Sequence, residues 1–274
     1  MKLGKFRLDG FVASLLRRPW SGMYSDGYIY SLLPRQRSHL WIVAAPKSGS
    51  TWLSVLLKRY LGWETRSLVF SFDRREQEPS LRALAEAASH EHVLWKHLHT
   101  RASQSTLDLI QRAGILPIIQ TRRLDDTLVS LGDHFDSEST TSSLAYMDDA
   151  QWGRLDGAAR QQFLVDMAAP WYFNFYAGWF SSELVRSGAA YICRYEELRE
   201  DPARELLRIC AHYGLPTDPE RADAAVAYAA TQFTRKNRGI VGRGAGLTDE
   251  QRESLTRMRH YYADIDFSKV GFPD

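Results

Sequence analysis

The chain has 274 residues, of which 44% are hydrophobic and 25% charged, and its formal net charge is +2. This composition is that of a globular protein, and the near-neutral charge argues against a general nucleic-acid binder. Cys193 and Cys210 form neither a disulfide scaffold nor a zinc pattern. No apolar run is long enough to span a bilayer, and residues 1–37 lack a signal-peptide pattern, so we expect a cytoplasmic protein.

Strands and helices alternate along the chain. Apolar runs predict strands at 39–45, 67–72, 92–97, 115–121 and 189–195. Helical spacing predicts helices at 51–62, 80–89, 102–114, 124–135, 158–188 (with a break at Pro170), 202–215, 220–233 and 248–265. Strands separated by helices indicate an α/β fold, with a central parallel sheet covered by helices on both faces. Residues 136–157 are polar and irregular, which fits an exposed loop or lid.

The junction between the first strand and the next helix reads Pro-Lys-Ser-Gly-Ser-Thr-Trp over residues 46–52. A small-residue turn before a helix places backbone N–H groups and the positive helix end around an anion. Gly49 allows close approach, Lys47 adds a charge, and Trp52 offers a face for a purine. The order of residues is not that of a Walker A loop. A plain strand-to-helix turn with a capping hydroxyl is the alternative interpretation.

This motif resembles the 5′-phosphosulfate loop, PKSGTTW, of the sulfotransferases that use 3′-phosphoadenosine 5′-phosphosulfate (PAPS). The resemblance implies one P-loop NTPase-like sulfotransferase domain over residues 1–274. Residues 1–37 would be an extension packed on it, and residues 136–157 an acceptor-side lid. It also implies that the co-substrate is PAPS, that the product is adenosine 3′,5′-bisphosphate (PAP), and that no metal is needed. The loop residues expected to bind the nucleotide are Lys47, Ser48, Gly49, Ser50, Thr51 and Trp52.

Further motifs follow in the order that the family predicts. Arg122 and Ser130, eight residues apart, are similar to the pair that holds the 3′-phosphate, and an Arg fork suits a phosphate. Tyr195, in the stretch Arg-Tyr-Glu-Glu-Leu, matches the tyrosine near the adenine, and Phe233 is a weaker match to the same pocket. The stretch from Arg235 resembles the family's RKGxxG segment in either of two registers. Its expected phosphate-binding residues are Arg235, Lys236, Arg238 and Gly239.

The general base in this family is the His of a KTHLP-like stretch at the end of a strand, and residues 95–99 read Trp-Lys-His-Leu-His. Neither alignment register fits fully. His97 is the preferred base and His99 is the second candidate, while Lys47 is expected to stabilise the leaving 5′-phosphate. A hydrogen-bonded structural histidine is the alternative for either position.

The acceptor is expected to be a small molecule with a hydroxyl group and an apolar or aromatic part, because the helix around residues 170–180 is aromatic-rich. An aromatic helix is more often core than pocket. Candidate acceptor-side residues are Phe70, Phe72, His99, Phe135, Tyr146, Trp171 and Asn174, the last replacing a histidine usual in the family. A small-molecule kinase using ATP and Mg²⁺, and a non-catalytic PAP-binding module, are the alternative functions. Residues 248–253 have a faint likeness to the family's dimer motif, which leaves a homodimer open.

Overall fold

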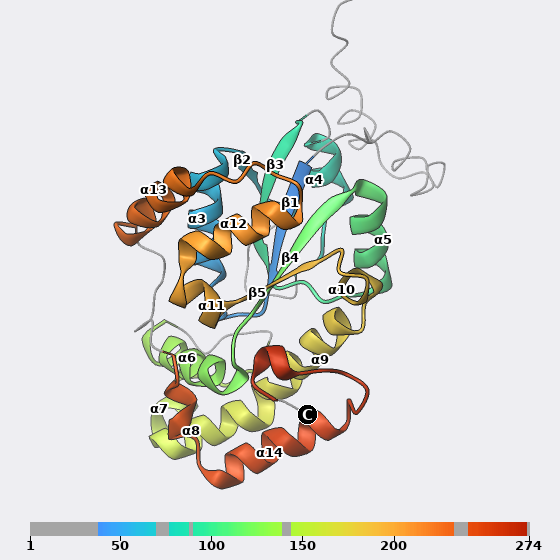
Figure 1. Cartoon of the computed structure of the whole chain (residues 1–274). Coiled ribbons are helices and arrows are strands. Elements are labelled where there is room, and N and C mark those ends of the chain that lie inside the picture. Colours follow the sequence, from blue (N-terminus) through green and yellow to red (C-terminus); the bar gives the residue numbers. More distant parts are fainter. Residues whose placement is uncertain (1–37, 70–76, 88–89, 139–143, 233–240, 273–274) are drawn as a thin grey trace, which may run out of the picture.

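A five-stranded parallel sheet forms the centre of the fold, with the strand order β2-β3-β1-β4-β5 (Figure 1). The computed structural model describes residues 38–69, 77–87, 90–138, 144–232 and 241–272. The strands are β1 (Ser38–Ala44), β2 (Glu64–Arg66), β3 (His92–Leu98), β4 (Ile115–Thr121) and β5 (Tyr191–Arg194). The predicted α/β class with a central parallel sheet is therefore confirmed.

Two hydrophobic cores lie on the two faces of the sheet because side chains alternate along each strand. Leu40, Ile42 and Ala44 of β1 pack with α3, α12 and α13 on one face. Trp41 and Val43 pack on the other face, in a core to which α5 and α9 contribute (Figure 1). Strand β1 is buried on both faces, which explains its unbroken apolar sequence.

Most helices agree with the predicted positions. The first of them, α3, starts after Gly49, and α5 ends at the left-handed Gly114. The helical segments up to α9 are α3 (Ser50–Leu61), α4 (Leu81–Glu86), α5 (Gln104–Ala113), α6 (Leu124–Ser137), α7 (Asp149–Arg154), α8 (Gly157–Phe163), the π-helical η1 (Leu164–Ala168) and α9 (Ala169–Phe180). The rest are α10 (Glu183–Arg186), α11 (Tyr195–Glu200), α12 (Pro202–His212), α13 (Pro219–Ala230), the 3₁₀ turns η2 (Arg243–Gly246) and η3 (Ser268–Val270), and α14 (Asp249–His260).

A second, all-helical layer lies beyond the carboxyl end of the sheet. Helices α6, α7, α8 and α14 gather there, and α9 connects them to the sheet (Figure 1, lower half). The expected break at Pro170 is wrong, because α8, the π-helical segment η1 and α9 follow one another without a gap. Pro170 lies in the first turn of α9, where the missing N–H of a proline is best tolerated, directly after the wider turn of η1.

The expectation that residues 136–157 are irregular is wrong for residues 136–137 and 149–154, which are helical, whereas residues 144–148 are irregular. Helix α6 extends to Ser137, and Asp148 caps α7. Trp152 of α7 is 4% exposed, packs edge-on against Phe135 with ring centroids 5.3 Å apart, and donates its indole N–H to Asp136. One buried tryptophan therefore fixes a stretch that is polar on average. Its role as a lid stays a prediction.

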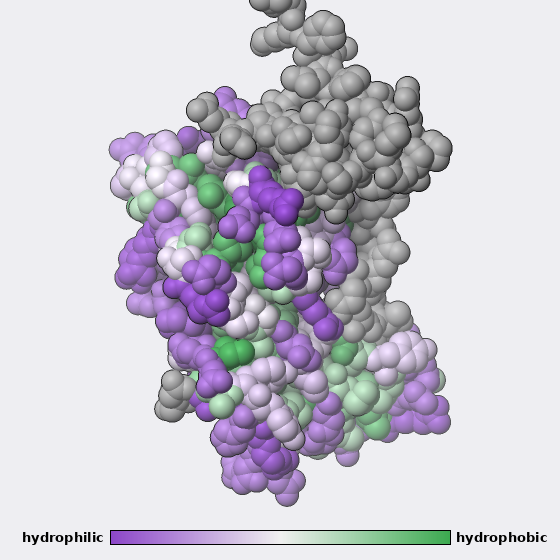
Figure 2. Space-filling view, turned by 90° about the vertical axis from the view of Figure 1, so that its right-hand side faces the viewer, coloured by the Kyte–Doolittle hydropathy of each residue, from purple (hydrophilic) through white to green (hydrophobic). Residues whose placement is uncertain are grey.

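The strand expected over 67–72 is also shifted. Strand β2 lies at Glu64–Arg66, residues 67–69 are not in a strand, and 70–76 lie outside the described residues. The extension 1–37 is outside them as well. No helix in the described part of the chain is both long and apolar enough to cross a membrane. Hydrophilic residues cover most of the described surface on the face in Figure 2, with hydrophobic ones in small groups between them.

Candidate active site

The loop between β1 and α3, residues 45–49, lies at the point where the chain changes direction in the sheet. From β1 the chain passes to β2 and β3 on one side, whereas β4 and β5 lie on the other. In open parallel sheets, ligands bind beyond the carboxyl ends of the strands at such a switch point. The fold therefore places Lys47 and Gly49 at the favoured position for a ligand.

The backbone of this loop is unusual. Lys47 has φ 65°, the only non-glycine residue with positive φ in the described part of the chain, and Gly49 has φ 92°. Such a conformation costs about 1–3 kcal/mol for a non-glycine residue, and it persists where the surroundings require it. The Ser48 hydroxyl donates to the Ala45 carbonyl over 2.7 Å, and the Ser48 N–H donates to the same oxygen. Ser48 therefore closes the turn, rather than presenting its hydroxyl proton to a ligand.

Helix α3 begins at the end of this loop without a side-chain cap. Gly49 occupies the N-cap position, and no side-chain oxygen there accepts the first N–H groups of the helix. The first N–H groups of a helix have no partner within it, and they carry the positive end of the helix dipole. Ser50 and Thr51 stand in this first turn. The arrangement is a ready anion site.

Arg122 and Tyr195 cover the loop from the ends of β4 and β5. Arg122 donates to the Lys47 carbonyl over 3.0 Å, and its guanidinium lies 4.6 Å from the centre of the Tyr195 ring. Tyr195 packs directly on Gly49, where a Cβ would be 2.5 Å from the ring. Burial raises the pKa of Tyr195 above its ordinary value, and the neighbouring Arg122 opposes that shift. The two motifs, far apart in sequence, thus meet at the loop.

Trp52 extends this aromatic surface. Its ring meets Tyr195 edge-on with centroids 6.4 Å apart, and Arg199 of α11 lies 5.4 Å from the Trp52 ring centre. Sequence reasoning missed Arg199, although it lies one helical turn after Tyr195. Two rings and two guanidinium groups beside an anion site suit a nucleotide, because a purine stacks on aromatic and guanidinium faces.

Gln120 is a second residue that sequence reasoning missed. Its side chain is fully buried on β4, its amide nitrogen would lie 3.5 Å from a Cβ at Gly49, and neither of its polar atoms has a hydrogen-bond partner. A polar residue inside the apolar run Ile-Leu-Pro-Ile-Ile-Gln was the available signal. Buried polar groups are normally satisfied, so this amide marks a site where a water or ligand atom belongs.

The two candidate bases, His97 and His99, lie together at the end of β3. Trp41 pairs with Trp95 and Val43 with Leu98, so β3 carries one residue more than β1 between these pairs. Such a β-bulge changes the direction of the side chains beyond it. His97 therefore contacts Ser54 of α3, with 3.2 Å between Nδ1 and Oγ, rather than following Trp95 to the opposite face.

His99 has a defined tautomer. Its Nδ1 lies 2.7 Å from the carbonyl oxygen of Ala44, at the end of β1. A carbonyl can only accept, so Nδ1 carries the proton, and neutral His99 has its lone pair on Nε2. The side-chain oxygen of Gln77 accepts a hydrogen bond from the His99 backbone N–H, and the ring centroids of His97 and His99 are 6.0 Å apart. Both histidines are partly exposed.

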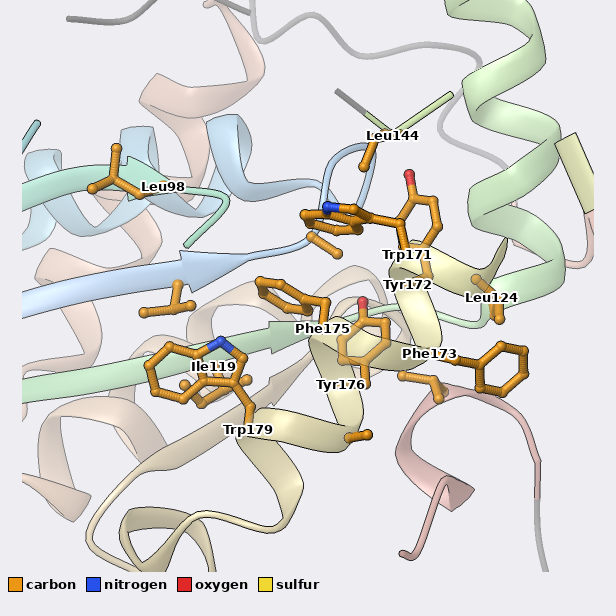
Figure 3. Packing of buried hydrophobic residues seen from close by; sticks show 14 of the residues in the cluster. Leu98, Ile119, Leu124, Leu144, Trp171, Tyr172, Phe173, Phe175, Tyr176 and Trp179 are labelled. Atoms are coloured by element: carbon orange, nitrogen blue, oxygen red, sulfur yellow. The ribbon is translucent and has the colours of Figure 1, made fainter. Parts of the chain in front are cut away.

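The aromatic helix α9 reaches the loop through Tyr172, which sequence reasoning did not select. The Tyr172 hydroxyl donates to the Pro46 carbonyl over 3.0 Å, and burial raises the pKa of Tyr172 well above its ordinary value, so it is a neutral donor. Trp171 and Tyr172 lie on the part of α9 shown in Figure 3, above the rings of Phe175 and Tyr176. Trp171 stacks on Phe175 at 5.2 Å and has Arg101 5.5 Å from its ring centre.

Several other predicted residues are not brought to the loop. Asn174 is exposed and accepts a hydrogen bond from Tyr262, on the side of α9 away from Tyr172. Phe135 is a core residue against Trp152, and Tyr146 is 70% exposed. Ser130 is 2% exposed on α6. The expected residues outside the described part of the chain are Phe70, Phe72, Phe233, Arg235, Lys236, Arg238 and Gly239.

Comparison with known proteins decides the family. The model of the sulfotransferase domain matches residues 37–240. This chain belongs to the sulfotransferase domain family. The match spans β1 to α13, which includes the loop, Arg122, both histidines and Tyr195, so the sulfotransferase core contains the whole site described above.

Solved structures show the same sulfotransferase fold at low sequence identity. A mouse sulfotransferase, SULT7A1, complexed with PAP, is 16% identical, with a TM-score of 0.63 over 91% of this chain and 94% of that one. A retinol dehydratase complexed with androsterone and the inactive cofactor PAP is 12% identical, with a TM-score of 0.55 over 90% and 84%. Sulfotransferase STF9 from Mycobacterium avium is 12% identical, with a TM-score of 0.51 over 87% and 79%. No curated protein matches the sequence.

Within the described residues of this sulfotransferase, no group of three or more His, Cys, Asp or Glu side chains is placed to hold a metal ion.

Proposed function

We propose that the protein transfers the sulfuryl group of PAPS to a hydroxyl group of a small-molecule acceptor with an apolar or aromatic part. The observation that carries this proposal is the loop between β1 and α3. Lys47 and Gly49 both have positive φ there, Arg122 is bonded to the Lys47 carbonyl, and Tyr195 covers Gly49. Two of the solved structures with this fold hold PAP, which supports the same nucleotide here.

Each part of the loop has a task in this reaction. The uncapped N–H groups of α3 and Lys47 would bind the 5′-phosphosulfate end, and Trp52 and Tyr195 would line the adenine. Arg122 and Ser130 would hold the 3′-phosphate. During transfer, negative charge grows on the 5′-phosphate oxygen as its bond to sulfur breaks. Donors already in place at that oxygen, Lys47 above all, would stabilise the charge.

We propose His99 as the general base, in place of the His97 that the sequence favours. The contact with the Ala44 carbonyl supports this assignment, because it fixes the ring proton on Nδ1 and so gives the neutral ring its lone pair on Nε2. The acceptor hydroxyl would give its proton to Nε2 as its oxygen bonds to sulfur, and PAP would leave with the electron pair of the old bond. His97, held by Ser54, would support the ring of His99 from the same side of β3.

The test is a transfer assay with PAPS and a panel of phenols and alcohols. Lys47→Ala and His99→Gln should each lower turnover by about 10²–10⁴-fold. His97→Gln should have a smaller effect. His92→Gln is the matched control, since His92 stacks on Trp63 at the opposite end of the same strand. Full activity of His99→Gln together with an inactive His97→Gln would show that His97 is the base.

Binding and chemistry are separated by calorimetry with PAP. Binding of PAP without transfer to any acceptor would favour the non-catalytic module, and transfer from ATP with Mg²⁺ would favour the kinase. The buried free thiols of Cys193 and Cys210 fit a reducing compartment, so we propose the cytoplasm as the site of action. A homodimer is tested by the mass of the protein in solution.

A further inference from the structure

Helix α6 carries an acidic face around Ser130. Asp126 lies four residues before Ser130 and Asp133 three residues after it, so all three side chains share one face of the helix. Asp125 stands beside Asp126 in the first turn. Carboxylates about one helical turn from the Ser130 hydroxyl disfavour the binding of a phosphate there, because the carboxylates and the phosphate are both negative and repel each other.

Each of these carboxylates has a compensating group. Asp126 is fully buried and accepts the N–H of Gly242 over 2.8 Å and the N–H of Gly244 over 2.7 Å, one on each oxygen. Asp133 pairs with the Arg243 guanidinium. Three consecutive residues, Gly242 to Gly244, thus meet the acids on both sides of Ser130. We name Gly242–Gly244 the glycine turn.

Asp125, in the first turn of α6, also has a compensating group. Asp125 forms a salt bridge with Arg123. Arg252 of α14 donates to the carbonyl of Gly244 in the glycine turn over 3.4 Å and to the carbonyl of the following Ala245 over 2.7 Å. Charge compensation along α6 therefore depends on Arg123, directly before the helix, and on the glycine turn, which α14 contacts.

The contact between the glycine turn and α6 leaves no room for side chains at residues 242 and 244. Gly242 has φ 87°, which L-residues with a side chain rarely adopt. A Cβ at Gly244 would lie 2.3 Å from the carboxyl carbon of Asp125. Glycine is needed at both positions for the two N–H groups to reach Asp126.

We propose that the glycine turn masks the acidic face of α6, so that the 3′-phosphate of the nucleotide can bind beside Ser130. Arg243, Asp126 and Asp133 are positioning residues in this proposal, which rests on the nucleotide assignment in the proposed function. When the turn is in place, Asp133 is paired with Arg243 and both oxygens of Asp126 accept backbone N–H groups, so less of their negative charge acts on a phosphate beside Ser130. When it is not, the same face repels the phosphate.

The experiment compares two ligands that differ in the 3′-phosphate. Calorimetry measures the Kd of PAP and of adenosine 5′-monophosphate for the wild type, Arg243→Gln, Asp133→Asn and the double variant. Arg243→Gln should raise the Kd of PAP about tenfold, since Asp133 loses its paired arginine about a turn from Ser130, and the Kd of the monophosphate by less than about twofold. Asp133→Asn in the same chain removes that carboxylate, so the double variant should return to within about threefold of the wild type.

Two matched controls separate charge from structure. Arg243→Lys keeps the cation and should bind PAP nearly as the wild type does. Arg186→Gln removes an exposed arginine that pairs with Glu183 far from α6, and should change neither Kd. The loss in Arg243→Gln should shrink at high salt, because screening weakens repulsion between partly exposed charges.

Two results would overturn the proposal. One is an equal loss of affinity for both ligands in Arg243→Gln, which would mean that the turn serves only the fold. The other is a double variant no better than Arg243→Gln. A wild type that binds PAP no better than the monophosphate would instead refute the nucleotide assignment itself, so the two failures can be told apart.

Discussion

Replacing Gly49 by alanine probes the contact between the β1–α3 loop and the Tyr195 ring. Gly49 has φ 92°, and a Cβ there would lie 2.5 Å from one ring carbon of Tyr195 and 2.7 Å from another. Ordinary contact between carbons is near 3.5–4.0 Å, so the ring would have to move by about 1 Å. That movement would also draw the ring away from the Arg122 guanidinium, now 4.6 Å from its centre.

The size of the effect follows from two costs. A left-handed conformation costs an L-residue about 1–2 kcal/mol, and a partly buried cation–aromatic contact contributes about 0.5–1 kcal/mol. A loop that relaxes to avoid these costs must be returned to its present shape when the nucleotide binds. The sum of about 1.5–3 kcal/mol corresponds to a rise of about 10- to 150-fold in the Kd of PAP.

The assay is calorimetry with PAP, together with thermal unfolding. Gly114→Ala is the matched control, because Gly114 also has positive φ, at 63°, but no atom lies within 4 Å of its Cβ position. It should lose stability without losing affinity. Tyr195→Ala combined with Gly49→Ala should show less than additive loss, since the clash partner is gone. Unchanged affinity of Gly49→Ala for PAP would refute the reasoning.

Two further predictions concern the neighbouring elements. Tyr172→Phe leaves the Pro46 carbonyl without its donor, so it should lower the free energy of unfolding by about 1–2 kcal/mol in chemical denaturation and raise the KM for PAPS. An unchanged unfolding curve would contradict this. Tyr261→Phe is the control, because the Tyr261 side chain is 87% exposed. Burial raises the pKa of Glu205 above 4.5, against the opposing hydrogen bond from Tyr191, so the stability that Glu205 contributes is present at low pH and is lost as pH rises through its folded-state pKa. Glu205→Gln removes that loss, so its stability relative to the wild type should increase with pH above 4.5, and a pH-independent difference would contradict the assignment.

The features that sequence could predict are those set by local pattern. The strand, loop and helix around Lys47 are encoded within one short stretch, and Arg122 and Tyr195 follow their own strands. The central position of β1 could be anticipated from its apolar residues, since a strand between two others is buried on both faces. These elements lie where the motifs predict them.

The features that sequence could not predict depend on contacts between distant segments. The facing of His97 could not be predicted, because β3 has a bulge against β1, and a bulge exists only once the two strands pair. The helical phase of α9 explains why Tyr172 meets the loop while Asn174 turns away, and a helix with aromatic residues on all sides does not reveal that phase. Trp152 orders a polar stretch through contacts with α6 that composition cannot show.

The hydrogen bond from Tyr172 to the Pro46 carbonyl has a consequence for how this enzyme could acquire new acceptors. It fastens the aromatic helix to the turn that would hold the sulfate, so the helix cannot slide without disturbing the donor end. Since the sequence predicts that α9 lines the acceptor site, variation in acceptor choice should accumulate in single side chains of α9, such as Trp171, while the helix keeps its place. A survey of active variants selected on bulkier alcohols would reveal whether diversification follows that course.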